Sequence, residues 1–208
     1  MRTHEQFLED LIIWVRENKD QVVIILATFI FIIALIPILI NYNAKAKKES
    51  WNMYAQMQSN FYKGNFSEAV NQSANLISQH GKTNAAKFAF LTKANALFYL
   101  REYDQAISAY DGFINKYKKG ELIPIALYGK AYAQEMSGKF QDAILSYDTI
   151  INDYSESYLL PESYFNKARC LELKGDRPYA VEAYQMVSTM FPQTPWQTMA
   201  KARIEALK

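Results

Sequence analysis

The chain has 208 residues, of which 50% are hydrophobic, and it contains 15 tyrosines and one cysteine. Its 23 basic and 21 acidic residues nearly cancel, and because nucleic-acid partners usually require a basic face, no such partner is expected. The single cysteine, Cys170, excludes an internal disulfide framework and a cysteine-rich zinc site.

Residues 1–20 form a short acidic tail with three basic and five acidic side chains. Its apolar residues recur at helical spacing, which predicts an amphipathic helix. Such a helix either lies in the membrane interface beside a spanning segment or binds a partner or degradation factor. Its acidity disfavours tight binding to anionic lipid. The apolar side consists of Phe7, Leu8, Leu11, Ile12 and Val15.

An uncharged segment from Val22 to Ile40 follows the tail, with Thr28 as its only polar residue. Its 19 residues would form a helix of roughly 28 Å, close to the ~30 Å hydrocarbon thickness of a bilayer. Pro37 lies near its end, where a spanning helix tolerates a kink. We therefore predict a transmembrane helix over residues 21–41 that contacts lipid through this segment.

A cleaved signal peptide is the competing interpretation, because Ala44-Lys45-Ala46 has the small-x-small form of a cleavage site. Three features argue against cleavage: the apolar run exceeds the usual ~7–15 residues, a long segment precedes it, and that segment is acidic. An uncleaved signal anchor fits better. Three Lys or Arg residues flank each end of the anchor, so the positive-inside rule does not decide the orientation.

Residues 42–192 contain a pattern that repeats every 37 residues, in four units of one register. Self-similarity at a fixed period of this size is the mark of a solenoid. The clearest columns are Ala69, Ala106, Ala143 and Ala180; Val70, Ile107, Ile144 and Val181; Leu76, Phe113, Ile150 and Val187; Tyr110, Tyr147 and Tyr184, with Ser73 in the first unit; and Ala94, Ala131 and Ala168, with Met57 in the first unit.

Each unit reads as a helical hairpin, because two apolar-periodic stretches flank a short break. The breaks contain Gly64, Arg101, Gly138 and Gly175. Glycine suits a helix C-terminus because it adopts positive φ without a Cβ clash. In the last unit we expect Asp176 to cap the second helix, with Pro178 in its first turn. No hairpin buries its apolar face alone, so neighbours must stack.

The third and fourth units resemble the tetratricopeptide repeat family. The third unit has the family's small residue, turn glycine, turn aromatic and second-helix pair, and the fourth exits at Phe191-Pro192. The motif residues of the third unit are Ala131, Gly138, Phe140, Ala143 and Tyr147. The resemblance covers about residues 51–192 and implies an α-solenoid that binds proteins. The unit is longer than the usual 34 residues, Arg101 replaces a turn glycine, and Arg177 replaces a turn aromatic.

Residues 193–208 form the last predicted element, a helix that covers the final hairpin. Its apolar residues, at helical spacing, are Trp196, Met199, Ala200, Ile204 and Leu207. The complete prediction is an all-α protein: a single N-terminal transmembrane helix, an α-solenoid of about four tetratricopeptide-type hairpins, and a C-terminal capping helix.

No catalytic constellation is apparent, and we do not expect an enzyme. His4 precedes the membrane segment and His80 lies in a loop, so an anchor that spans keeps them apart. Cys170 has no histidine in its unit, which favours a buried structural thiol over a nucleophile. The carboxylates lack metal-ligand spacing and the glycines form no phosphate-binding loop, so no metal, cofactor or small-molecule substrate is expected.

In the tetratricopeptide family the first helix of each hairpin lines the concave face, and this position implies an aromatic groove here. Aromatic rings offer large contact areas and tyrosine adds a polar group, which favours protein recognition. The alternative is that these rings pack against the capping helix or the next hairpin. The candidate groove residues are Tyr54, Phe61, Phe98, Tyr99, Tyr128, Tyr132, Phe165 and Arg169, and the same face adds Trp51, Tyr62, Asn95, Glu135 and Glu172.

Three lysines, Lys93, Lys130 and Lys167, also recur every 37 residues. They do not occupy the position of the lysine clamp with which some family members bind a C-terminal carboxylate. We expect them to form a solvated ladder.

The order of acidic tail, single span, repeat array and capping helix resembles the ancillary subunit of the bacterial Sec translocon, the YfgM-like family. The resemblance implies a single-pass protein of the bacterial inner membrane with a cytoplasmic tail and a periplasmic array. It also implies a chaperone-like role in holding or handing on proteins that leave the channel. Two alternatives stay open: a structural coordinator of an envelope-assembly or cell-division complex, and a repeat module that delivers substrate to a membrane transporter.

Overall fold

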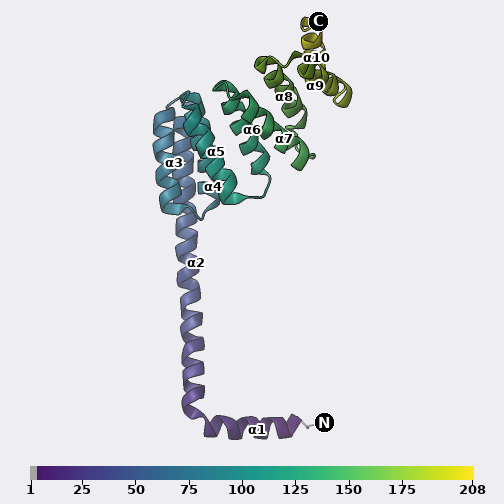
Figure 1. Ribbon diagram of the computed structural model, residues 1–208. Helices are drawn as coiled ribbons and strands as arrows, with labels where there is room; N and C mark the ends of the chain where they lie inside the picture. Colours follow the sequence, from purple (N-terminus) through teal and green to yellow (C-terminus); the bar gives the residue numbers. More distant parts are fainter. Residues whose placement is uncertain (1–3) are drawn as a thin grey trace. The chain divides into compact units, whose positions relative to one another are not determined.

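The computed structural model describes residues 4–208, and within that range its regular secondary structure is entirely helical (Figure 1). The chain forms two compact units, one extending through Glu49 and the other from Ser50 to Lys208. The all-α prediction is therefore confirmed. The helices are α1 (His4–Glu17), α2 (Lys19–Tyr62), α3 (Phe66–His80), α4 (Asn84–Tyr99), α5 (Tyr103–Tyr117), α6 (Leu122–Met136), α7 (Phe140–Asp153), α8 (Leu160–Lys174), α9 (Arg177–Met190) and α10 (Pro195–Ala206).

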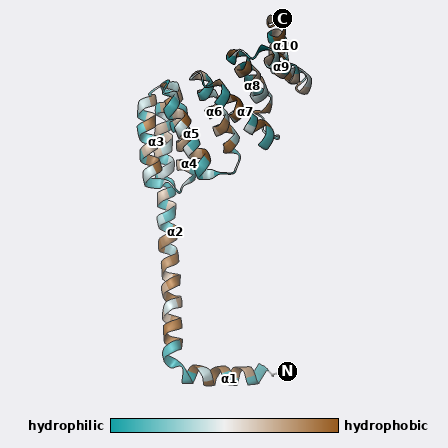
Figure 2. Cartoon of the chain, viewed as in Figure 1, coloured by the Kyte–Doolittle hydropathy of each residue, from teal (hydrophilic) through white to brown (hydrophobic). Residues whose placement is uncertain are grey.

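The first unit holds α1 and the apolar part of α2. Every described side chain of α1 is at least partly exposed, and Figure 2 shows the apolar stretch of α2 as mostly brown, with some paler turns. In residues 4–208, α2 is the one helix that is long and apolar enough to cross a membrane. The Thr28 hydroxyl donates to the Ile24 carbonyl at 2.7 Å, so the polar side chain of this stretch is satisfied within the helix.

The second unit is a solenoid in which each helix from α3 to α9 packs against the next one in the chain. Its four hairpins are the last turns of α2 with α3, α4 with α5, α6 with α7, and α8 with α9. Consecutive packing of this kind is what a repeat array requires, because each hairpin buries its apolar face against its neighbours.

The four hairpin turns share one backbone conformation. One repeat position, one or two residues after the end of the first helix, has a positive φ in every hairpin: 80° at Gly64, 62° at Arg101, 78° at Gly138 and 95° at Gly175. In the third turn the Gly138 N–H donates to the Glu135 carbonyl at 2.9 Å and the next N–H donates to the Gln134 carbonyl at 2.8 Å, which is the Schellman pattern. The same pair of bonds closes the other three turns, including the one that contains arginine.

Asp176 occupies the N-cap position of α9, but its side chain does not cap the helix, which corrects the prediction. Its φ and ψ are −81° and 60° instead of the extended values of a capping residue, and its carboxylate accepts a hydrogen bond from the Lys174 ammonium at 2.8 Å. The first turn of α9 closes through the Asp176 backbone carbonyl, which accepts from the Ala180 N–H at 2.9 Å. Pro178 lies in that first turn, as expected.

The repeat columns form the core. All four residues of the first alanine column and all three of the second are fully buried, as are Tyr147 and Tyr184 of the tyrosine column. The first hairpin replaces this Ala–Tyr combination with Met57 and Ser73, whose sulfur and hydroxyl lie 2.8 Å apart. In this hairpin the large side chain is on the first helix and the small one on the second, the reverse of the other hairpins. The Met–Ser pair and the Ala–Tyr pair therefore fill a similar volume.

Helix α10 covers the end of the array, which confirms the capping helix. It packs against α9 and α8. The side chains of Trp196 and Ile204, and of Leu207 just after the helix, lie against a buried cluster that includes Tyr184. Met199 faces away and is 45% exposed.

Cys170 is fully buried in the third and fourth hairpins' shared core. Burial raises the pKa of its thiol well above the usual range, and the nearby Glu135 carboxylate raises it further. The thiol therefore stays protonated and structural, as the sequence predicted.

Candidate protein-binding face

A row of aromatic rings runs across the first helices of three consecutive hairpins. We call Phe61, Tyr99, Phe98, Tyr132 and Tyr128 the aromatic ladder. The ring centroids are 5.6 Å apart for Phe61 and Tyr99, 5.9 Å for Tyr99 and Phe98, 5.3 Å for Phe98 and Tyr132, and 6.4 Å for Tyr132 and Tyr128. These spacings are those of interacting aromatic pairs, so the ladder connects α2, α4 and α6 without a gap.

The repeat itself produces this ladder. Phe61 and Phe98 occupy the same position in successive units, and Tyr128 and Tyr132 lie one turn apart on one side of α6. Tyr99 is held in place by Phe66 of α3. The two rings stack with centroids 4.9 Å apart and an interplanar angle of 10°. Rings held by packing lose little conformational entropy when a partner binds, which favours recognition.

An ion pair continues the face where the ladder ends. Arg169 of α8 donates two hydrogen bonds to the Glu135 carboxylate of α6, at 2.7 and 2.8 Å, and its guanidinium lies 5.9 Å from the centre of the Tyr132 ring. Burial alone would lower the pKa of Arg169, but the Glu135 contacts outweigh burial and raise it. The Glu135 side chain is only 6% exposed, so the charge of Arg169 is needed there.

The Tyr128 hydroxyl is also committed to the next hairpin. It donates to the Glu162 carboxylate at 2.6 Å and accepts from the Asn166 amide at 2.9 Å. Burial, followed by the Glu162 contact, raises the pKa of Tyr128 above its usual range. The polar end of Tyr128 therefore braces α6 against α8, while its ring takes part in the ladder.

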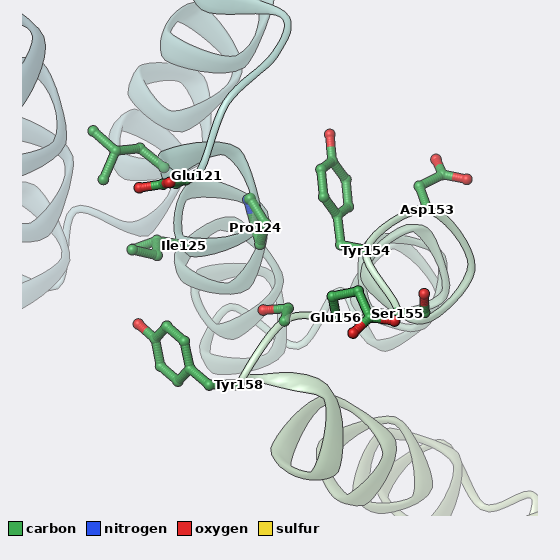
Figure 3. Close-up of a pocket in the computed structure, with 10 residues that line it drawn as sticks. Glu121, Pro124, Ile125, Asp153, Tyr154, Ser155, Glu156 and Tyr158 are labelled. Atoms are coloured by element: carbon green, nitrogen blue, oxygen red, sulfur yellow. The ribbon is translucent and has the colours of Figure 1, made fainter.

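A cavity of about 550 Å³ lies at the start of α6, opposite the loop between α7 and α8 (Figure 3). This volume is in the range of small-molecule and side-chain binding sites. Sequence reasoning missed it because the loop closes over α6 only in three dimensions. The cavity is lined by Glu121, Leu122, Pro124, Ile125, Asp153, Tyr154, Ser155, Glu156, Ser157 and Tyr158.

Comparison with known families assigns the repeat type. A tetratricopeptide repeat model matches residues 91–158, and a second one matches residues 162–194. Residues 91–158 and 162–194 are tetratricopeptide repeats. These matches fall on the second, third and fourth hairpins, where the sequence has its clearest columns.

Solved structures show the same fold as this tetratricopeptide array. A protein of Podosopora anserina, described as a kinesin light chain with nearly identical TPR-like repeats, has a TM-score of 0.63 at 15% identity, covering 77% of this chain and 85% of that one. A tetratricopeptide repeat protein from Parabacteroides merdae gives 0.64 at 11% identity, with coverages of 77% and 60%. MamA from Desulfovibrio magneticus gives 0.60 at 12%, with coverages of 76% and 88%. At these identities the likeness concerns the fold alone. No curated protein sequence matches the chain significantly.

The predicted groove residues lie in three places. Five of them form the ladder, and Arg169 lies at its end. Tyr54 lies outside the ladder and contacts Trp51 and Phe88, with ring centroids 5.5 and 6.1 Å apart. Phe165 is the exception, because it is only 3% exposed and packs between Tyr184 and Trp196. Its assignment to an open tetratricopeptide groove is corrected: the capping helix has taken it into the core.

An exposed apolar column was only half recognised from the sequence. It occupies one repeat position in the last turn of the first helix of each hairpin, namely Tyr62 (81% exposed), Tyr99 (58%), Met136 (47%) and Leu173 (52%). The two tyrosines were among the expected groove residues, whereas the other two were missed. The 37-residue period was the signal that would have found them.

The lysine column is not a solvated ladder, which corrects that prediction. Lys130 bonds Asp111 of the preceding helix at 2.7 Å, and Lys167 bonds Asp148 at 2.6 Å. For the first lysine, Lys93, the repeat position that holds the aspartate in the other two units is occupied by Ala74. These ion pairs join neighbouring tetratricopeptide hairpins, so the two lysines stabilise the stack of hairpins.

The described residues, 4–208, contain no group of three or more His, Cys, Asp or Glu side chains placed to hold a metal ion. What the face offers is therefore ring surface, an exposed apolar column and hydrogen-bonding groups. Such groups recognise polypeptides by shape and apolar contact.

Proposed function

We propose that the chain is a single-pass membrane protein whose tetratricopeptide array binds other proteins through the aromatic ladder and the exposed apolar column. The observation that carries this proposal is the continuity of the ladder over three hairpins. Clusters of aromatic side chains are where binding energy concentrates in protein interfaces. The apolar stretch of α2 is the proposed anchor, with residues 22–40 in contact with lipid.

The finer assignment rests on the resemblance to the YfgM-like family. In this proposal the protein is an ancillary subunit of the bacterial Sec translocon in the inner membrane, with the array in the periplasm, where it contacts secreted polypeptides. The groove would then hold exposed apolar segments of clients as they leave the channel. An anchored array is suited to this task because tethering raises its effective concentration near the channel.

Site-specific photocrosslinking in native membranes tests the partner. A benzoylphenylalanine at Tyr99, which is 58% exposed on the ladder, should capture translocon subunits or secreted chains. The matched control is the same probe at Leu145, which is 57% exposed on the second helix of its hairpin. Equal capture of the same proteins at both sites, or capture of unrelated proteins alone at Tyr99, would contradict the assignment.

Protease protection of intact cells and spheroplasts tests the orientation. A periplasmic array is degraded in spheroplasts and protected in intact cells. Protection in both preparations would place the array in the cytoplasm and remove the translocon assignment while leaving protein binding in place.

Two alternatives remain distinct proposals. A structural coordinator of an envelope or cell-division complex would bind folded partners, so the full chain in nanodiscs would not suppress aggregation of an unfolded client. A transporter-associated module would need a ligand pocket, and the cavity beside α6 is the observation that favours it. Binding of a free small molecule in that cavity separates this alternative from the scaffold.

A further inference from the structure

The cavity beside α6 has a chemical character of its own. Three of its ten lining residues are acidic and none is basic. In Figure 3, Tyr158 and Ile125 lie on one side of the cavity and Tyr154 on the other, with the start of α6 facing the loop that carries Glu156. The site therefore combines carboxylates with aromatic and aliphatic walls.

The cavity's carboxylates are uncommitted. In the part of the chain that the structure describes, no ion pair involves Glu121, Asp153 or Glu156. Elsewhere in the array carboxylates are used, since Asp111 and Asp148 each pair with a lysine of the next helix. Unpaired carboxylates around an apolar cavity create a local negative potential, and none of the residues that line this cavity carries a positive charge.

We propose that this cavity binds a basic side chain, preferentially arginine, of a polypeptide that lies on the aromatic ladder. The guanidinium of arginine is planar, stacks on tyrosine rings and donates hydrogen bonds from its edge to carboxylates, and the aliphatic stem of the side chain packs against apolar walls. Each of these partners is present: Tyr154 and Tyr158 as rings, Glu121 and Glu156 as carboxylates, and Ile125 as apolar wall.

The occupant is a polypeptide because the cavity adjoins the ladder. Ile125 lines the cavity and lies three residues before Tyr128 on α6, so the two side chains share one side of that helix. A chain that contacts Tyr128 and Tyr132 through apolar residues can therefore place a neighbouring side chain in the cavity. The inference rests on the proposed protein-binding function and adds a charge preference to it.

A pair of peptides tests the inference on the full chain in nanodiscs. The probe is fluorescein-labelled Leu-Phe-Gly-Arg-Leu-Phe, and its twin carries citrulline, the neutral isostere of arginine, at the same place. We expect the arginine peptide to bind at least tenfold more tightly by fluorescence polarisation. The double variant Glu121→Gln/Glu156→Gln should abolish this ratio, because it removes the charge and keeps the shape.

The matched control is Asp142→Asn/Glu182→Gln, which makes the same change in net charge at two exposed acidic residues outside the cavity. It should keep the tenfold ratio. The variant Phe98→Ala should weaken both peptides alike and leave the ratio unchanged, so a failure of the ladder is distinguishable from a failure of the cavity.

Three results would overturn the inference: equal affinity for both peptides, a ratio that survives Glu121→Gln/Glu156→Gln, or no binding of either peptide. Competition by free arginine as effective as that of the peptide would also contradict it. That outcome would identify a small-molecule site and support the transporter-associated alternative.

Discussion

The two ends of the first-helix face differ at equivalent positions of the same repeat. Phe61 and Phe98 occupy one column in the first two hairpins, and Glu135 and Glu172 occupy it in the last two. The phenylalanines join the aromatic ladder, whereas Glu135 pairs with Arg169 of the following hairpin and Glu172 with Arg203 of α10.

This difference shows that a single column can carry either aromatic rings or ionic contacts to the next element. At the N-terminal end its side chains are rings that contact the ring of a neighbouring hairpin. At the C-terminal end the same position reaches forward and holds the next element, and α10 covers the remaining apolar surface. Recognition should thus depend on the N-terminal end, and stability at the C-terminal end should depend on charge.

The largest expected effect comes from breaking the buried pair. Arg169→Met leaves the Glu135 carboxylate, 6% exposed, without its partner. We expect a loss of about 3 kcal/mol in the free energy of unfolding, because a buried charge stripped of its counter-charge is strongly destabilising. Urea unfolding of the full chain in detergent, followed by circular dichroism, measures it.

Two variants check that charge is the cause. Arg203→Met breaks a pair whose arginine is 46% exposed, so its cost should stay below about 1 kcal/mol. The double variant Glu135→Met/Arg169→Met should recover most of the lost stability, since an apolar pair replaces the ionic one. Equal destabilisation by the single and double variants would assign the effect to packing instead.

The next effect arises where the two ends meet, between α5 and α6. A Cβ added at Gly129 would lie 2.5 Å from the Tyr110 ring, whereas one added at Gly112 would lie 3.4 Å from Phe90. Gly129→Ala should therefore cost about 2 kcal/mol through overpacking. Gly112→Ala, also inside a helix, should be neutral or stabilising by up to about 1 kcal/mol. Equal unfolding midpoints for the two variants would contradict the close approach.

The sequence was sufficient to predict the fold because the same pattern of core and turn residues occurs in four successive units. Each alanine column is buried and each turn has a positive φ. The irregular positions were harder. Met57 and Ser73 looked like two separate breaks in two columns, yet they touch and form one exchange of volume within the hairpin. Only their spatial pairing shows this.

The candidate face was predicted less completely, for reasons that differ by residue. Phe165 is on the expected helix, but its burial depends on Trp196 of α10, a contact that the family's position does not specify. The lysine–aspartate pairs had a signal in the sequence, because Asp111 and Asp148 share the lysines' period. The α6 cavity had none, since it forms between a helix start and a loop from the following hairpin.

A smaller effect is expected in the turns. Arg101 has a φ of 62° where the other three hairpins have glycine, so Arg101→Gly should stabilise the array by about 0.5–1 kcal/mol by relieving backbone strain. The opposite change, Gly138→Ala at a φ of 78°, should destabilise by a similar amount. If Arg101→Gly lowered the unfolding midpoint, the side chain would have a stabilising role that its exposed position does not suggest.

The smallest effect is a pH dependence confined to the C-terminal end. Burial acts to raise the pKa of Glu172, but hydrogen bonds from Arg203 and Tyr184 outweigh it and lower the pKa. A carboxyl whose pKa is lowered in the folded state adds stability above its unfolded pKa of about 4.3, and this stability is lost as the pH falls through the folded value. Comparing wild type with Glu172→Gln by urea unfolding at pH 7 and pH 3 should therefore show a difference of at most about 1 kcal/mol that shrinks at the lower pH.

A difference that grew on acidification would mean that Glu172 is held protonated in the fold. Phe61 and Phe98, at the same column, carry no charge, so Phe98→Leu should show no comparable change with pH and provides the control at the other end of the face.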